Sequence, residues 1–133
     1  MDKPVFENDT YAMWFHGSDK VVHHEIKKAL NPGDLRTILG KGVDLMRRNR
    51  ASKWLSDDKG NGAIPQADSE WAMGTFVPQA VQAGWKFWAI VQPDQAVGKL
   101  QMKRFIDANA KVGLTVRTFP NADAAMTDRK SVV

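Results

Sequence analysis

The chain has 133 residues, of which 43% are hydrophobic and 26% are charged, and its net charge at pH 7 is +4. This length predicts a single domain over residues 1–133, able to bury roughly two-thirds of its unfolded surface without covalent or metal staples. The absence of cysteine excludes disulfides and thiolate metal sites. The longest strongly apolar run, Phe87–Val91, is far too short to span a bilayer, and the first ten residues have no apolar signal core. We therefore expect a cytoplasmic, bacterial-type protein without a membrane span.

The N-terminal segment has the pattern of antiparallel strands. Val5–Glu7 is a short β-prone stretch. Tyr11–Gly17 and Val21–Ile26 are longer β-prone runs on either side of a segment rich in turn residues, which predicts a hairpin. The two-residue alternation of a strand places Met13 and Phe15 on one face and their sequence neighbours on the other.

The clearest helix follows the hairpin. Asn31 is expected to cap it and Pro32 to occupy its first position. Arg47, Arg48 and Arg50 fall at its C-terminal end, where positive charge offsets the helix dipole. The apolar residues at helical spacing, which predict one buried stripe, are Leu35, Ile38, Leu39, Gly42, Val43 and Met46.

The basic residues concentrate near this helix. Between Asp19 and Lys53 the chain has nine basic and four acidic residues, a net charge of +5, whereas the rest of the chain has a net charge of −1. Such a span attracts nucleic acid or anionic lipid. However, no aromatic residues alternate with the basic ones, as a platform for single-stranded nucleic acid requires. We interpret the cluster as a solvated helix end and do not expect nucleic-acid binding.

The middle of the chain predicts a strand and a long helix. Lys53–Asp57 is a short strand, and Ala67–Gly84 has a helical pattern with Asp68 as its cap. Pro78 lies inside this pattern. Because proline removes a backbone hydrogen bond, the helix should kink or split near Phe76–Val77.

The C-terminal part continues the alternation of strand and helix. Trp85–Val91 has little polar alternation, which predicts a strand buried on both faces. A helix should begin at Pro93–Asp94 and end at Gly113, followed by a strand over Leu114–Phe119 and a short helix capped by Asn121. The last three residues are expected to fray. The apolar contacts of the longer helix are assigned to Val97, Leu100, Met102, Phe105, Ile106 and Ala110.

This order of elements predicts an α/β fold. The sheet should be mixed and mostly parallel, with about five to six strands, an N-terminal antiparallel hairpin and about four helices. The chain also has five tryptophans. Trp54 and Trp88 lie in predicted strands and are assigned to the core, whereas Trp71 begins the long helix.

Four segments carry a resemblance to a known family: WLSD (Trp54–Asp57), DSEW (Asp68–Trp71), PQAVQAGWKFWAIV (Pro78–Val91) and FPNADAAM (Phe119–Met126). Together they resemble the STAS-like superfamily of anti-sigma-factor antagonists and sulfate-transporter cytoplasmic domains, and in particular its small, stand-alone bacterial members. The resemblance implies a non-enzymatic module that binds a protein partner or a second copy of itself.

The family's phosphorylation site is not carried over by this resemblance. In the anti-sigma-factor antagonists, a Ser or Thr in an Asp-Ser-x-Gly turn accepts a phosphate. Here Ser69 follows Asp68, but Trp71 stands at the glycine position. No serine or threonine of this chain is therefore assigned the role.

The candidate binding residues lie around the loop that follows the predicted strand Lys53–Asp57. Asp57 and Asp58 end that strand, and Asp68, Glu70 and Trp71 begin the next helix. In α/β domains, ligands bind beyond the carboxyl ends of strands, so we assign these five residues a recognition role. The alternative is that the loop is only a turn, since Asp, Gly and Asn are ordinary turn residues.

Two further hypotheses compete with partner binding. A pocket that binds a small ligand or lipid could open near the Pro78 helix, because the kink there loosens the packing. A metal-dependent enzyme would use Asp57, Asp58 and the histidines. Adjacent residues on a strand point to opposite faces, and isolated strand histidines are usually at the surface, so we expect no catalytic residue, no metal site and no cofactor.

Overall fold

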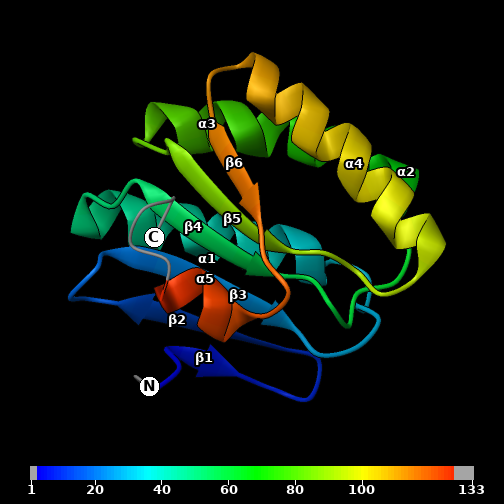
Figure 1. Cartoon of the computed structure of the whole chain (residues 1–133), viewed down its shortest axis with the longest axis horizontal. Coiled ribbons are helices and arrows are strands. Elements are labelled where there is room, and N and C mark those ends of the chain that lie inside the picture. Colours follow the sequence, from blue (N-terminus) through cyan, green and yellow to red (C-terminus); the bar gives the residue numbers. More distant parts are fainter. Residues whose placement is uncertain (1–2, 128–133) are drawn as a thin grey trace.

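The computed structural model describes residues 3–127 and has one six-stranded mixed sheet. The strands lie side by side in chain order (Figure 1). The first three strands pair antiparallel, and the last three continue the sheet in parallel with β3. Their bounds are β1 Phe6–Glu7, β2 Tyr11–His16, β3 Val21–Ile26, β4 Lys53–Asp57, β5 Phe87–Val91 and β6 Thr115–Thr118.

Four helices accompany the sheet, which confirms the predicted fold class. The second of them is continuous but changes its winding, so it carries the three labels α2, η1 and α3. No helix among residues 3–127 combines the length and apolar character needed to cross a bilayer. The bounds are α1 Asp34–Asn49, α2 Gln66–Trp71, η1 Ala72–Phe76, α3 Val77–Gln82, α4 Ala96–Lys111 and α5 Ala122–Thr127.

The helices are divided unequally between the two faces of the sheet. The short helix α5 lies on one face, in front of the strands in Figure 1, whereas α1 and α3 lie behind them. The main core forms on this second face, where α1, the α2–η1–α3 helix and α4 cover the strands. The smaller core beneath α5 consists of Val21, Leu55, Ala89 and Ala125, with partly buried neighbours.

Helix α1 confirms the predicted apolar stripe but not the predicted cap. All six stripe residues are buried, and Arg47, Arg48 and Arg50 are exposed at its C-terminal end. The N-cap position is occupied by Gly33, whose φ of 87° suits only glycine without strain. The Asn31 side chain does not cap the helix; instead, the Asn31 backbone N–H donates a hydrogen bond to the Asp34 carboxylate at 2.9 Å.

The Pro78 helix widens where a kink or split was predicted. A π-helical turn, η1, ends at Phe76, and Pro78 follows directly in the first turn of α3, so the change of winding lies where proline interrupts the helical hydrogen bonds. The helix begins at Gln66 with Pro65 at the N-cap, so the prediction that Asp68 caps it is wrong. Single π turns inside α-helices are frequent at functional sites.

Helix α4 faces the sheet with a different side from the predicted one. It starts at Ala96, later than predicted, and buries Gly98, Met102 and Asn109. Val97 and Leu100 are 60% and 56% exposed, so their assignment to the core is wrong. A Cβ on Gly98 would come within 2.8 Å of the Pro93 side chain, so the bare glycine lets the first turn of α4 pack against the loop that precedes it. Ala110 is also exposed, whereas Phe105 and Ile106 are partly buried as predicted.

Candidate functional site

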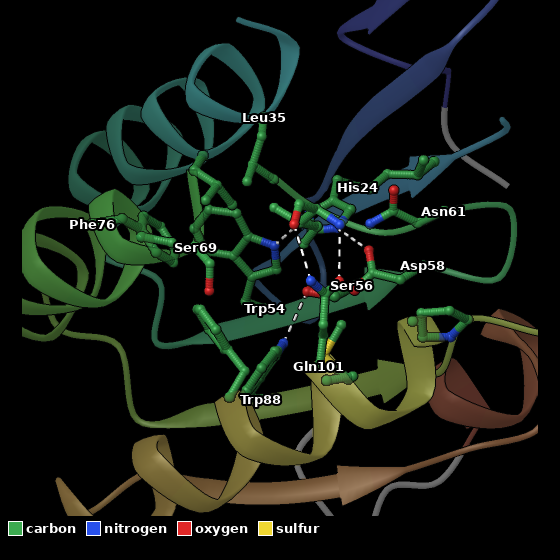
Figure 2. A pocket seen from close by; sticks show the side chains of 18 of the residues that line it. His24, Leu35, Trp54, Ser56, Asp58, Asn61, Ser69, Phe76, Trp88 and Gln101 are labelled. Carbon is green, nitrogen blue, oxygen red and sulfur yellow. Dashed lines mark hydrogen bonds and ion pairs between the residues drawn. The ribbon is translucent and has the colours of Figure 1, made fainter. Parts of the chain in front are cut away.

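A pocket opens between the sheet and the three helices that cover its main face. Its floor comes from β3, β4 and β5, and its walls come from α1, from the α2–η1 segment and from α4 (Figure 2). The volume accessible to the centre of a water molecule is about 60 Å³, which is more than a single water molecule requires. Its polar end, with Asp58 and Asn61, lies just beyond the carboxyl end of β4, where ligands of α/β sheets characteristically bind.

Aromatic rings form much of the pocket wall. Trp54 packs edge-on against Phe76 with ring centroids 5.3 Å apart, and Trp85 lies 5.8 Å from Trp54. Trp88 extends the chain of rings to Phe105 at 5.5 Å. Each such pair contributes about 0.5–1.5 kcal/mol beyond the burial of its area, so the ring contacts stabilise an apolar wall. The assignment of Trp54 and Trp88 to the core is confirmed.

His24 and Asp58 form a polar pair at the pocket floor. The His24 Nε2 and Asp58 Oδ1 atoms are 2.8 Å apart, and both residues are almost fully buried. The Trp54 indole N–H donates to His24 Nδ1 at 3.0 Å. Because an indole N–H can only donate, Nδ1 must be an acceptor, and the imidazole proton lies on Nε2 and points to Asp58. The three residues thus fix the tautomer of His24.

Ser56 lies in the same pocket as His24 and Asp58, but these three residues do not have the geometry of a catalytic triad. Its hydroxyl oxygen accepts the Trp88 indole N–H at 2.8 Å. A triad requires a histidine nitrogen that is free to take the serine proton. Both nitrogens of His24 are already bonded, one to Asp58 and one to Trp54. The arrangement therefore holds polar groups in place at the pocket floor instead of activating a nucleophile.

The loop after β4 closes one side of the pocket. A Cβ on Gly60 would lie 2.5 Å from the Lys27 carbonyl oxygen, so only glycine lets the loop pack against the end of β3. This close approach places Asn61 in the pocket, beside His24 and Asp58 (Figure 2). No residue between 3 and 127 hydrogen-bonds the Asn61 side-chain amide, although the residue is only 5% exposed. An unpaired amide that is so buried and borders a cavity is available to a ligand.

The other two histidines lie on the opposite face, beneath no long helix. His23 stacks on Trp14 with ring centroids 4.5 Å apart, and its Nδ1 is 3.0 Å from His16 Nε2. Burial lowers the pKa of His23 to about 3, and the neighbouring His16 and His24 add to the effect. All three histidines are buried, so the expectation that they lie at the surface is wrong. The reason is that β3 is covered on both faces, which leaves no solvent side for either His23 or His24.

Asp57 and Asp58 point to opposite faces, as the strand alternation predicts. Asp57 pairs in register with Glu25 on the face away from the pocket. Burial raises the pKa of Asp57, and the Asp58 charge adds to this, while a hydrogen bond from the Lys59 backbone N–H opposes it. Burial, followed by the Asp57 charge, likewise raises the pKa of Glu25. Within residues 3–127, no group of three or more acidic or histidine side chains is placed to hold a metal ion.

The remaining predicted binding residues do not converge on Asp58. Asp68 accepts a 3.3 Å hydrogen bond from Arg36 of α1, and the Arg36 guanidinium also lies 5.3 Å from the centre of the Trp71 ring. Glu70 is exposed and bonds to Gln66. Their neighbour Ser69 lines the pocket instead. Of the five candidate residues, the structure places Asp58 alone in the cavity.

Sequence reasoning missed His24, Ser56, Asn61 and the aromatic wall as parts of one site. The available signal was the doubled valine before the histidines, because apolar residues at both Val21 and Val22 indicate a strand buried on both faces. A histidine in such a strand needs partners inside the protein.

Comparison with protein-family models, with curated proteins and with solved structures finds no match to this chain. The fold and the pocket therefore define an α/β domain with an aromatic cavity between its sheet and its helices, and its role has to follow from that geometry.

Proposed function

We propose that this protein is a non-enzymatic binding domain that holds a small apolar ligand in the cavity beneath the α2–η1 segment. The observation that carries the proposal is an aromatic cavity whose floor is a fixed polar set, His24, Asp58 and the unpaired Asn61. Ligand sites are characteristically apolar with a few placed polar groups. The limited space favours a compact molecule over a long acyl chain.

The engaged nitrogens of His24 support binding rather than catalysis. A general base needs a free lone pair within reach of the substrate proton, and the Nδ1 lone pair of His24 accepts from Trp54. The π turn η1 supports the location, because Ala72 and Phe76 of this turn line the cavity.

A plug variant with a matched control tests the proposal. Ser69 lines the cavity from α2, whereas its neighbour Glu70 is exposed. Ser69→Met should fill the cavity and abolish binding of a neutral aromatic probe, 2-phenylethanol, in saturation-transfer NMR. Glu70→Met adds the same side chain outside and should leave binding intact. The proposal fails if the unaltered protein binds no aromatic probe, neutral or charged, or if the two variants bind alike while both stay folded.

Partner binding by a STAS-like module is the second candidate. The observation that favours it is the pair of exposed apolar residues Val97 and Leu100, one turn apart on α4. Self-association through this side of α4 would appear in light scattering coupled to size-exclusion chromatography as a mass above 14.9 kDa, lost in Leu100→Ser. A monomer at all accessible concentrations would remove self-association from this candidate.

A further inference from the structure

The charge inside the cavity is of one sign. No lysine or arginine is among the residues that line it, and Asp58 is the lining residue that carries a carboxylate. Asp58 is 5% exposed, so water compensates little of its charge. A buried carboxylate requires a cation or several hydrogen-bond donors to offset the loss of its hydration.

Within residues 3–127, the donor to the Asp58 carboxylate is a neutral one. It is the Nε2–H of His24, whose other nitrogen is fixed as an acceptor by Trp54. If His24 carried a second proton, its Nδ1–H would point at the Trp54 N–H, so this pair is not positioned as a full ion pair. The pocket therefore presents a carboxylate with unused capacity to accept hydrogen bonds.

The surroundings of Asp58 also favour a positive group. The hydroxyl oxygen of Ser56 lies on the same floor, and Asn61 lies beside the His24–Asp58 pair with its amide nitrogen turned towards them (Figure 2). The Trp54 and Trp88 rings line the same cavity with their N–H edges directed at His24 and Ser56, so they offer apolar contact to the body of a ligand. A carboxylate or phosphate ligand would find no compensating charge in this cavity.

We propose that the ligand is a compact organic amine, bound with its ammonium group at Asp58 and its apolar body against the aromatic wall. This assignment rests on the proposed binding function and narrows it to a ligand class. The amine is the donor, and the Asp58 carboxylate is its acceptor.

A charge series on the unaltered protein tests the assignment. The probes are 2-phenylethylamine, 2-phenylethanol and phenylacetate, which share a ring and differ in the charge of the head group. Binding is followed at pH 7 in phosphate buffer by the fluorescence of the cavity tryptophans and by saturation-transfer NMR. We expect the amine to bind about tenfold or more tightly than the alcohol, as charged hydrogen bonds do relative to neutral ones, and phenylacetate to bind weakest.

Two isosteric variants locate the effect. Asp58→Asn should lower the affinity for the amine about tenfold and change the affinity for the alcohol by less than about threefold. Asp57→Asn removes the same charge one residue away, on the other face, and should change neither. Circular dichroism verifies that both variants fold, and the charge series needs no variant.

The outcomes separate this inference from the proposed function. Equal binding of amine and alcohol, or preferred binding of phenylacetate, overturns the amine assignment and leaves a neutral or anionic ligand pocket. Equal losses of amine binding in Asp57→Asn and Asp58→Asn overturn it as well, because the effect would then be one of general charge. Failure of all three probes to bind overturns both the assignment and the pocket's proposed function.

Discussion

Each face of the sheet buries one histidine of β3, and the two histidines have different surroundings. On the face beneath the long helices, His24 has a partner for each ring nitrogen, Trp54 and Asp58. On the opposite face, His23 stacks on Trp14, and its Nε2 has no hydrogen-bond partner between residues 3 and 127. Neighbouring residues of one strand thus differ in chemistry because the layers that cover them differ. On the first face, His24 is part of the polar floor of a cavity, whereas on the second face His23 is packed against Trp14.

The largest effect is expected at the tryptophan that joins the pocket wall to its floor. Trp54→Ala removes a 1% exposed side chain and leaves His24 Nδ1 without a donor. We expect a loss of about 3–5 kcal/mol in the free energy of unfolding, measured by urea denaturation. Trp54→Phe retains most of the ring, so it should lose less. A loss below about 1 kcal/mol in Trp54→Ala would contradict the central place of this residue in the pocket face.

The next largest effect is a dependence of the unfolding free energy on pH, which we expect from His23. The folded-state pKa of His23, about 3, lies below its ordinary value of 6.5, so between these values the unfolded chain binds the proton more readily. Stability should therefore fall as the pH drops below 6.5, by roughly 1 kcal/mol per pH unit, and this loss should end near pH 3. The raised pKa values of Asp57 and Glu25 make stability change with pH in the opposite direction. The contribution of His23 is therefore measured by comparing the unaltered protein with a variant that lacks this histidine.

The variant His23→Gln isolates this contribution. It lacks the titrating group while both carboxyls stay in place, so the difference between the two stability curves reports His23 alone. We expect a flatter curve for the variant between pH 6.5 and 5 in urea denaturation. Parallel curves would show that His23 does not become costly to bury when it is protonated.

A smaller effect is expected where α1 presses on the pocket wall. A Cβ on Gly42 would come within 2.1–2.9 Å of Trp54 ring atoms, whereas one on Gly40 would meet nothing within 4 Å. Gly42→Ala should cost about 1–3 kcal/mol by overpacking. Gly40→Ala, on the exposed side of the same helix, should gain about 0.5–1 kcal/mol because alanine has the higher helix propensity. Equal thermal shifts in the two variants would show that α1 does not pack tightly on Trp54.

The smallest effect is expected on the face away from the cavity. Burial and Asp58 disfavour the charged form of Asp57, which is only partly buried. Asp57→Asn relieves this cost but loses a weak 3.3 Å bond to the Lys59 backbone. After solvent screening, the net change in unfolding free energy at pH 7 should stay below about 1 kcal/mol. A larger loss would mean that Asp57 fixes the turn after β4.

The sequence by itself determined the order of the elements, the hairpin, the buried stripe of α1 and the burial of β5 on both faces. These follow from local periodicity, because a repeat of two or of three to four residues decides which side of an element avoids water. The opposite directions of Asp57 and Asp58 follow from the same alternation.

Only the tertiary structure decided which face each element turns to the core and which polar groups meet there. Val97 and Leu100 had the right chemistry for the core, but α4 turns Gly98, Met102 and Asn109 to the interior instead. His24 and Asp58, 34 residues apart, became partners because β3 and β4 are adjacent and the Gly60 loop closes over them. Contacts between residues so distant in sequence depend on how whole layers pack, and no local pattern encodes that.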